Sequence, residues 1–79
     1  RKVYPVPADQ FVNFDFGAQQ GSGALELRDN LGRLVYSMPI DLSTGSKHEV
    51  KTGNLAAGVY NYRFVMNDKV QYGQVVVRR

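Results

Sequence analysis

Apolar and polar side chains alternate along most of the chain, and no stretch keeps the three-to-four-residue spacing of an amphipathic helix. In FVNFDF (11–16), Val12, Phe14 and Phe16 point one way, while the residues between them point the other way. The same alternation returns in ALELRD (24–29), KHEVKT (47–52) and VYNYRFVM (59–66). A period of two is typical of β-strands with one buried face, so the pattern predicts an all-β protein.

Turn-forming residues separate the alternating stretches. Breaks are predicted at GAQQGSG (17–23), DNLG (29–32), IDLSTGS (40–46), NLAAG (54–58) and Asn67-Asp68. The two-residue Asn67-Asp68 loop is predicted to be a type I′ hairpin turn. Pro39 cannot donate a hydrogen bond to a sheet, so we expect it at a strand end or a sheet edge, closing the strand RLVYSM (33–38). Gly73 suggests a bulge in the last strand, whose facing is left open.

About seven strands are predicted once a short segment at YPVP (4–7) and a last strand at KVQYGQVVVR (69–78) are added. Short strands with turns about every 8–12 residues indicate a sandwich, in which two apolar sheet faces bury each other. The residues predicted to face inward are Val12, Phe14, Phe16, Leu25, Leu27, Val35, Val50, Leu55, Tyr60, Tyr62 and Phe64.

Length and charge narrow the class of protein. The chain has 79 residues, enough for one domain, and it begins RKVYP, so we expect a piece cut from a longer secreted or surface protein. Of its ten basic residues, Arg1, Lys2, Arg78 and Arg79 lie at the two ends, and six others face seven acidic residues between them. That distribution lacks the single-sign stripe of a nucleic-acid-binding surface. No run reaches the roughly eighteen apolar residues of a transmembrane segment.

Few residues offer reactive chemistry. The sequence has no cysteine and one histidine, His48, whose alternation with Val50 suggests a half-buried packing role. GAQQGSG lacks the Gly-Lys-Ser/Thr ending of a phosphate loop, and no Asp-x-Asp-x-Asp-Gly run offers a calcium site. We therefore expect no enzyme activity, no cofactor and no metal. A carbohydrate-binding accessory module is an alternative, although Tyr60 and Tyr62 fall on the core face and such modules need exposed rings.

Three short motifs and the last strand follow one another in a specific order. They are Tyr4, Pro5 and Pro7; Asp29, Leu31, Gly32 and Arg33; Leu55, Gly58, Val59 and Tyr60; and Gln74, Val75, Val76, Val77, Arg78 and Arg79. In this order and spacing, the full chain resembles the type A C-terminal sorting domain of the bacterial type IX secretion system, the Por secretion system C-terminal domain family. Val6 stands where members usually have Asn, and Gln74 where many have Lys.

The resemblance implies a seven-stranded, immunoglobulin-like antiparallel β-sandwich that acts as an export signal. Such domains reach the periplasm, where the folded domain is read by shuttle proteins and the outer-membrane translocon. The parent protein then reaches the outer-membrane surface or is secreted. On many cargo proteins a sortase-like transpeptidase removes the domain and joins the cargo to anionic lipopolysaccharide. The motif residues are therefore the expected recognition positions.

The resemblance also carries an alternative. A minority of family members keep the domain as an uncleaved structural or assembly part of the cell-surface secretion and attachment machinery, and Gln74 favours this alternative. In both cases we expect the last strand to complete its sheet and, as an edge strand, to offer unpaired N–H and C=O groups to a partner. Open edges would also allow a strand-swapped dimer.

Overall fold

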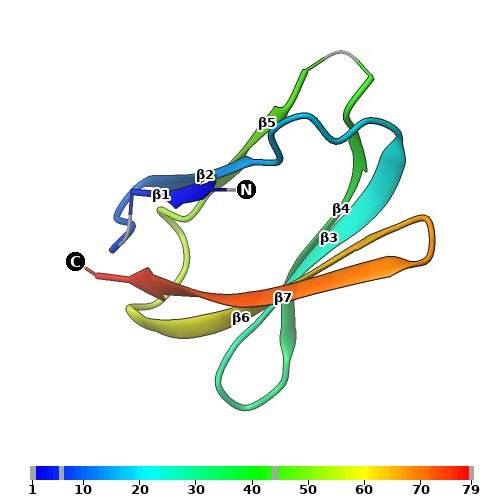
Figure 1. Ribbon diagram of the computed structural model, residues 1–79. Coiled ribbons are helices and arrows are strands. Elements are labelled where there is room, and N and C mark those ends of the chain that lie inside the picture. Colours follow the sequence, from blue (N-terminus) through cyan, green and yellow to red (C-terminus); the bar gives the residue numbers. More distant parts are fainter. Residues whose placement is uncertain (1, 6, 44, 79) are drawn as a thin grey trace.

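Two antiparallel sheets face each other in the computed structural model, which describes residues 2–5, 7–43 and 45–78 (Figure 1). The strands are β1 (Lys2–Tyr4), β2 (Phe11–Asp15), β3 (Ser22–Arg28), β4 (Leu34–Asp41), β5 (Lys47–Lys51), β6 (Gly58–Met66) and β7 (Lys69–Val77). One sheet has the order β1-β2-β5, and the other has the order β4-β3-β6-β7. The prediction of an all-β antiparallel sandwich with about seven strands is confirmed.

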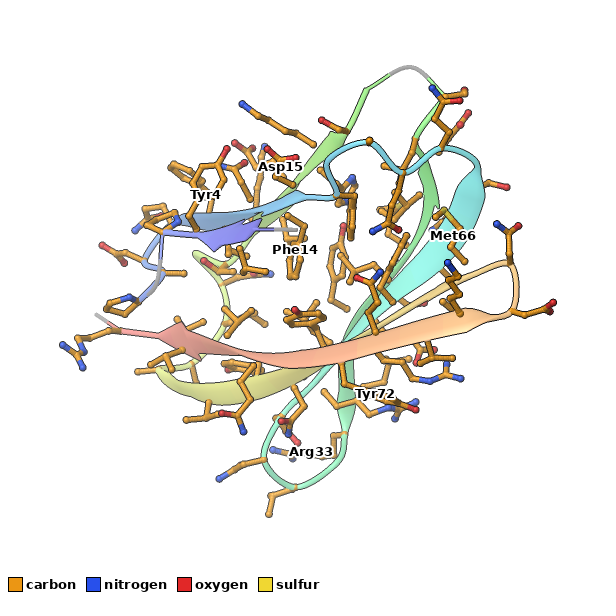
Figure 2. The ribbon with its side chains drawn as sticks, in the orientation of Figure 1. Tyr4, Phe14, Asp15, Arg33, Met66 and Tyr72 are labelled. Carbon is orange, nitrogen blue, oxygen red and sulfur yellow. The ribbon has the colours of Figure 1, made fainter. Side chains whose placement is uncertain are left out.

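Aromatic rings fill the space between the two sheets. The ring of Phe14 meets that of Tyr62 edge-on, with 5.0 Å between the centroids, and Phe16 stacks on Phe64 at 4.3 Å. Figure 2 shows Phe14 pointing from β2 into the interior. Burying a side chain of this kind contributes about 1.5–3 kcal/mol to folding. Contacts between rings of the β2 region and rings of β6 therefore hold the two sheets together.

The predicted inward residues are buried with two exceptions. Val35 and Leu55 are only partly buried and pack against the core from its margin. Val35 belongs to the edge strand β4 and lies at the register shift opposite Leu27/Arg28, where it has no partner in the β3–β4 register, while Leu55 lies in the loop before β6. The core also contains buried apolar residues outside the predicted set: Ala8, Ile40, Leu42, Met66, Val75 and Val77.

Strand β4 continues through Pro39, so the prediction of a strand that closes there, and of a loop from residue 40, is wrong. The N–H of Leu42 donates to the carbonyl of Gly21 at 2.8 Å. In the antiparallel register, the even-numbered residues of β4 therefore direct their backbone N–H and C=O groups towards β3. At the odd-numbered position 39, the missing N–H would point away from the sheet. Because β4 is an edge strand, proline costs no ladder hydrogen bond at this position.

The glycines of β3 and β7 lie where a neighbouring chain or ring approaches closely. β3 begins at Ser22, inside the predicted break, and a Cβ added to Gly23 would collide with the backbone of Val65. The β6–β7 register is regular through Gly73, so the predicted bulge is absent. A Cβ on Gly73 would lie 2.5 Å from the ring of Tyr62. Glycine is therefore needed in both strands for space.

The β6–β7 hairpin closes with two residues, as predicted, and Met66 pairs with Lys69. Asn67 has a φ of 56° and is the only non-glycine residue with a positive φ in the described part of the chain. A type I′ turn requires a positive φ at both central residues. The prediction of that turn type is therefore wrong, because Asp68 does not adopt it.

Candidate interaction surface

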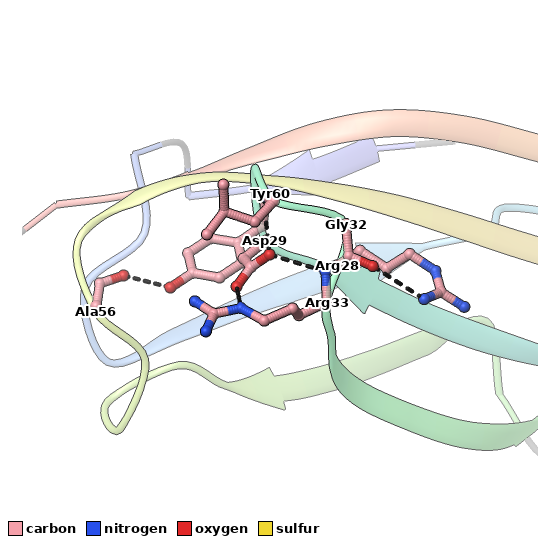
Figure 3. Close-up of polar contacts among 7 residues, drawn as sticks. Arg28, Asp29, Gly32, Arg33, Ala56 and Tyr60 are labelled. Atoms are coloured by element: carbon pink, nitrogen blue, oxygen red, sulfur yellow. Dashed lines mark hydrogen bonds and ion pairs between the residues drawn. The ribbon is translucent and has the colours of Figure 1, made fainter.

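The tight turn between β3 and β4 is organised by the side chain of Asp29. Its Oδ1 accepts hydrogen bonds from the backbone N–H groups of Leu31 at 3.0 Å and Arg33 at 2.9 Å, and its Oδ2 accepts one from Arg33 Nε at 2.7 Å (Figure 3). Gly32, with a φ of 84°, donates its N–H to the carbonyl of Asp29 at 3.0 Å. Asp is suited to this role because its short side chain reaches nearby backbone N–H groups.

The electrostatics of the turn follow from these hydrogen bonds. The backbone N–H of Arg33 is the main cause that holds the pKa of the Asp29 carboxyl below its usual range, and the bonds from the Arg33 side chain and Leu31 add to it. Arg28 donates to the carbonyl of Gly32 at 3.2 Å from the other side of the turn. The Arg33 side chain is 74% exposed, so its guanidinium is oriented by Asp29 and still faces solvent.

The segment before β6 lies against this turn. Tyr60 is buried, and its hydroxyl donates to the carbonyl of Ala56 at 2.5 Å, which fixes the loop four residues upstream (Figure 3). Leu55 donates its N–H to the carbonyl of Thr52 at 3.0 Å. A shallow concavity of about 160 Å³ separates the two segments and is lined by Asp29, Asn30, Arg33 and residues 56–60. It is too small and open to enclose an ordinary small-molecule ligand.

The end of β7 is held on both sides. Val75, Val76 and Val77 pair with Tyr60, Val59 and Gly58 of β6. On the opposite side, Ala8 donates its N–H to the carbonyl of Val76 at 2.7 Å and accepts a bond from Arg78 N–H at 2.8 Å. Val75 and Val77 are buried, whereas Val76 belongs to the outer face of the sheet. The last strand is therefore part of the core as well as the last element of the chain.

The structure brings most of the predicted recognition residues to one end of the sandwich. We call the 29–33 turn, the 54–60 segment and residues 75–78 the motif-bearing end. It contains Asp29, Gly32, Arg33, Leu55, Gly58, Tyr60, Val75, Val76, Val77 and Arg78. Pro7 adjoins it through Ala8. The pairing of β-strands explains the grouping, because the start of β6 lies beside both the end of β3 and the end of β7.

Four predicted positions, Pro5 among them, lie elsewhere or outside the described residues. Tyr4, joined to Pro5 by a cis peptide bond, belongs to β1 in the other sheet and points outward in Figure 2. Gln74 directly precedes residues 75–78 in β7, and its Nε2 is 3.4 Å from Asn61 Oδ1. Arg79 lies outside the described residues. Because Tyr4 pairs with β2, it lies in a different sheet from most of the other family motif residues.

Two contributors to this surface were not predicted from the sequence. Ala8 is almost fully buried and links the N-terminal segment to β7, and its only signal is its place directly after Pro7. Tyr72 is 68% exposed on the outer face of β7. Figure 2 shows its ring pointing away from the core, below the sheet. The alternation in VQYGQVVV could have identified Tyr72, had the inward facing of Val75 and Val77 been known.

A separate groove of about 660 Å³ runs between β4 and β5. Tyr36 and His48 meet across it, with 2.9 Å between the tyrosine hydroxyl and His48 Nε2. Burial lowers the pKa of His48 and raises that of Tyr36. His48 is half-buried, as predicted, and its contact links the two sheets. Among the described residues, no group of three or more His, Cys, Asp or Glu side chains lies close enough to hold a metal ion.

The aromatic rings bear on the alternative of a carbohydrate-binding module. The ring–ring contacts found within the described residues join buried or half-buried rings, whereas Tyr72 is the aromatic side chain most open to solvent. Two neighbouring exposed rings, which a sugar-stacking platform requires, are not found in that part of the chain.

The described residues include no helix that is long and apolar enough to span a membrane.

Comparison with known proteins adds an independent observation. Residues 2–78 match the protein family described as the secretion system C-terminal sorting domain. A comparison with curated proteins gives no match. The match covers both sheets and every predicted recognition position except Arg79, and such domains imply export to the cell surface or secretion. The chain therefore belongs to the family of C-terminal sorting domains of the type IX secretion system.

Proposed function

We propose that this domain directs its parent protein across the outer membrane as a folded signal, and that the machinery reads the motif-bearing end together with β7. The observation that supports this proposal most directly is the position of the last strand. β7 is held by β6 and Ala8 at its end, and it forms the edge of its sheet before that point. The domain acts by binding rather than by catalysis.

The partners follow from the same proposal. Shuttle proteins and the outer-membrane translocon bind the folded domain after it reaches the periplasm. A sortase-like transpeptidase then removes the domain from the cargo and joins the cargo to anionic lipopolysaccharide. The exposed Arg33 guanidinium, oriented by Asp29, and the exposed Arg78 supply cationic groups at the motif-bearing end for contacts with these partners.

A retained structural or assembly domain is the second candidate, and the position of Gln74 favours it. Gln74 replaces the lysine of many family members, and its amide lies beside Asn61 on the exposed outer face of the sheet. A neutral amide pair there removes a cation from the strand most directly linked to recognition. The mass of the mature parent protein distinguishes the two candidates, because a processed cargo lacks residues 1–79 and a retained domain keeps them.

Fusion to a reporter tests the proposed function. Residues 1–79 are joined to the C-terminus of a periplasmic reporter protein in a bacterium that has the type IX pathway. We expect the reporter outside the outer membrane, and we expect it to remain in the periplasm when the pathway's translocon gene is deleted. Retention of the reporter in the periplasm of the wild-type strain, with the domain folded, would contradict the proposal.

A further inference from the structure

The free edges of the two sheets differ in how they are protected against an added strand. On β4, Pro39 occupies an outward-facing position and has no N–H to offer. On β5, the bonds from Thr52 N–H to Gln10 and from Phe16 N–H to Ser46 place even-numbered residues in the ladder with β2. The residues whose backbone N–H and C=O groups face away from β2 are therefore Lys47, Glu49 and Lys51, and their charged side chains discourage the pairing of an added strand. β1 is only three residues long.

The edge of β7 carries none of these protections between residues 70 and 74. Because the Val76 carbonyl and the Arg78 N–H bond to Ala8, the even-numbered residues of β7 direct their backbone groups away from β6. Val70, Tyr72 and Gln74 therefore present N–H and C=O groups at this edge. None of the three is proline or charged. Past Gln74 the edge is closed, because Ala8 pairs there.

Side chains on the same part of β7 restrict the kind of strand that fits. Val70 is 40% exposed and Tyr72 is 68% exposed, both on the outer face. Tyr72 pairs with Arg63 of β6, and Arg28 of β3 lies on the same outer face. Glu26 lies 3.8 Å from Arg63 and 3.7 Å from Arg28 and offsets one of these two positive charges. The surface beside the edge is thus apolar with an excess of positive charge, which complements a segment that carries apolar and acidic side chains.

We propose that the β7 edge from Val70 to Gln74 binds an extended, net acidic segment of an export-machinery protein as an added β-strand. Unpaired backbone groups at strand spacing recognise an extended main chain, and the side chains beside them select its sequence. Ala8 sets the limit of the added strand at the C-terminal end of β7. This inference rests on the proposed function, and it assigns a specific edge and a partner chemistry to it.

Proline substitution tests the edge without breaking the ladder between β6 and β7. Tyr72→Pro and Gln74→Pro, made singly in the reporter fusion, each remove one outward-facing N–H. Ser37→Pro is the matched control, because it removes an outward-facing N–H from β4, two residues before the natural Pro39. Thermal unfolding of each purified domain identifies the variants that fold. We expect the folded β7 variants to lower the exported reporter about tenfold or more, and Ser37→Pro to leave export unchanged.

A second measurement covers the case in which both β7 prolines prevent folding. A benzophenone amino acid is placed at position 72 or, as a control, at position 11, which is 40% exposed on the outer face of the other sheet. We expect a cross-link to an outer-membrane protein from position 72 that position 11 does not give. No cross-link from position 72 in exporting cells would overturn the inference, as would normal export of a folded Tyr72→Pro or Gln74→Pro variant.

Two further outcomes separate this inference from its alternatives. If the unaltered fusion is not exported, the proposed function itself fails, whatever the variants do. If the purified domain dimerises, and Tyr72→Pro makes it monomeric while export continues, the edge binds a second copy of the chain and the inference is overturned. Sedimentation velocity of the purified domain and of Tyr72→Pro measures this directly.

Discussion

The two ends of this sandwich are built differently. At the motif-bearing end, the Asp29 side chain bonds three groups of its turn, Tyr60 holds Ala56, and Ala8 holds the end of β7. At the opposite end, each of two carboxylates bonds to one neighbouring residue only among those described: Asp15 accepts from Gly17 N–H, and Asp41 from Ser43 N–H, both at 2.9 Å. Most of the family motif residues therefore shape and stabilise one surface.

Truncation at the motif-bearing end should have the largest effect. Deleting residues 75–79 removes Val75 and Val77, which are 0% and 2% exposed, and takes away the partner of the first residues of β6. Two such side chains contribute about 3–6 kcal/mol by burial, most of the stability of a small domain. We expect no cooperative unfolding transition by circular dichroism. As a control, the double variant Arg78→Ser/Arg79→Ser keeps the chain length and should unfold cooperatively.

Loss of the Tyr60 hydroxyl should have a smaller effect at the same end. Tyr60→Phe removes the bond to the Ala56 carbonyl and leaves the buried ring in place. We expect the free energy of unfolding to fall by about 0.5–1.5 kcal/mol, measured by urea denaturation. Tyr72→Phe, at a side chain that is 68% exposed, is the matched control and should change it little. Equal effects of the two substitutions would show that the Tyr60–Ala56 bond does not stabilise the loop.

The carboxylates Asp29 and Asp41 provide a direct comparison of the two ends. Both have a pKa below the usual range, Asp29 chiefly because of the Arg33 backbone N–H, and Asp41 chiefly because of the Ser43 side chain. A lowered folded-state pKa adds stability above the unfolded-state value of 3.8, and this stability is lost as the pH falls further. At pH 7, we expect Asp29→Ala to lower the urea midpoint more than Asp41→Ala. The reverse order would contradict the contrast between the ends.

The smallest expected effect is a pH dependence from His48, which belongs to neither end. Burial lowers its pKa from the usual 6.5, so below that pH the unfolded chain takes up a proton more readily than the folded chain. The free energy of unfolding should therefore fall as the pH is lowered from 7.5 to 5. His48→Gln should make urea midpoints at these two pH values more alike. An unchanged difference between the two midpoints would assign the pH dependence to other groups.

Most of the architecture could be predicted from alternation and turn chemistry, whereas the predictions failed where two strands meet. Val12, Phe14 and Phe16 lie on the predicted face, because one buried face per strand gives a period of two. The role of Gly73 was misjudged, since the ring that needs its space belongs to Tyr62 on another strand. The end of β4 was misplaced, because proline is tolerated only at an edge and the edge position depends on sheet order.

The sequence by itself determined that this chain is a β-sandwich of the sorting-domain type, since patterning, turn residues and ordered motifs are all local properties of the chain. Only the tertiary structure decided which strands are edges, where Ala8 closes β7, and that motif residues far apart in sequence share one end. The physical reason is that strand pairing joins backbone groups with little regard to side-chain identity. Sheet order and free edges are therefore set by the packing of the whole domain.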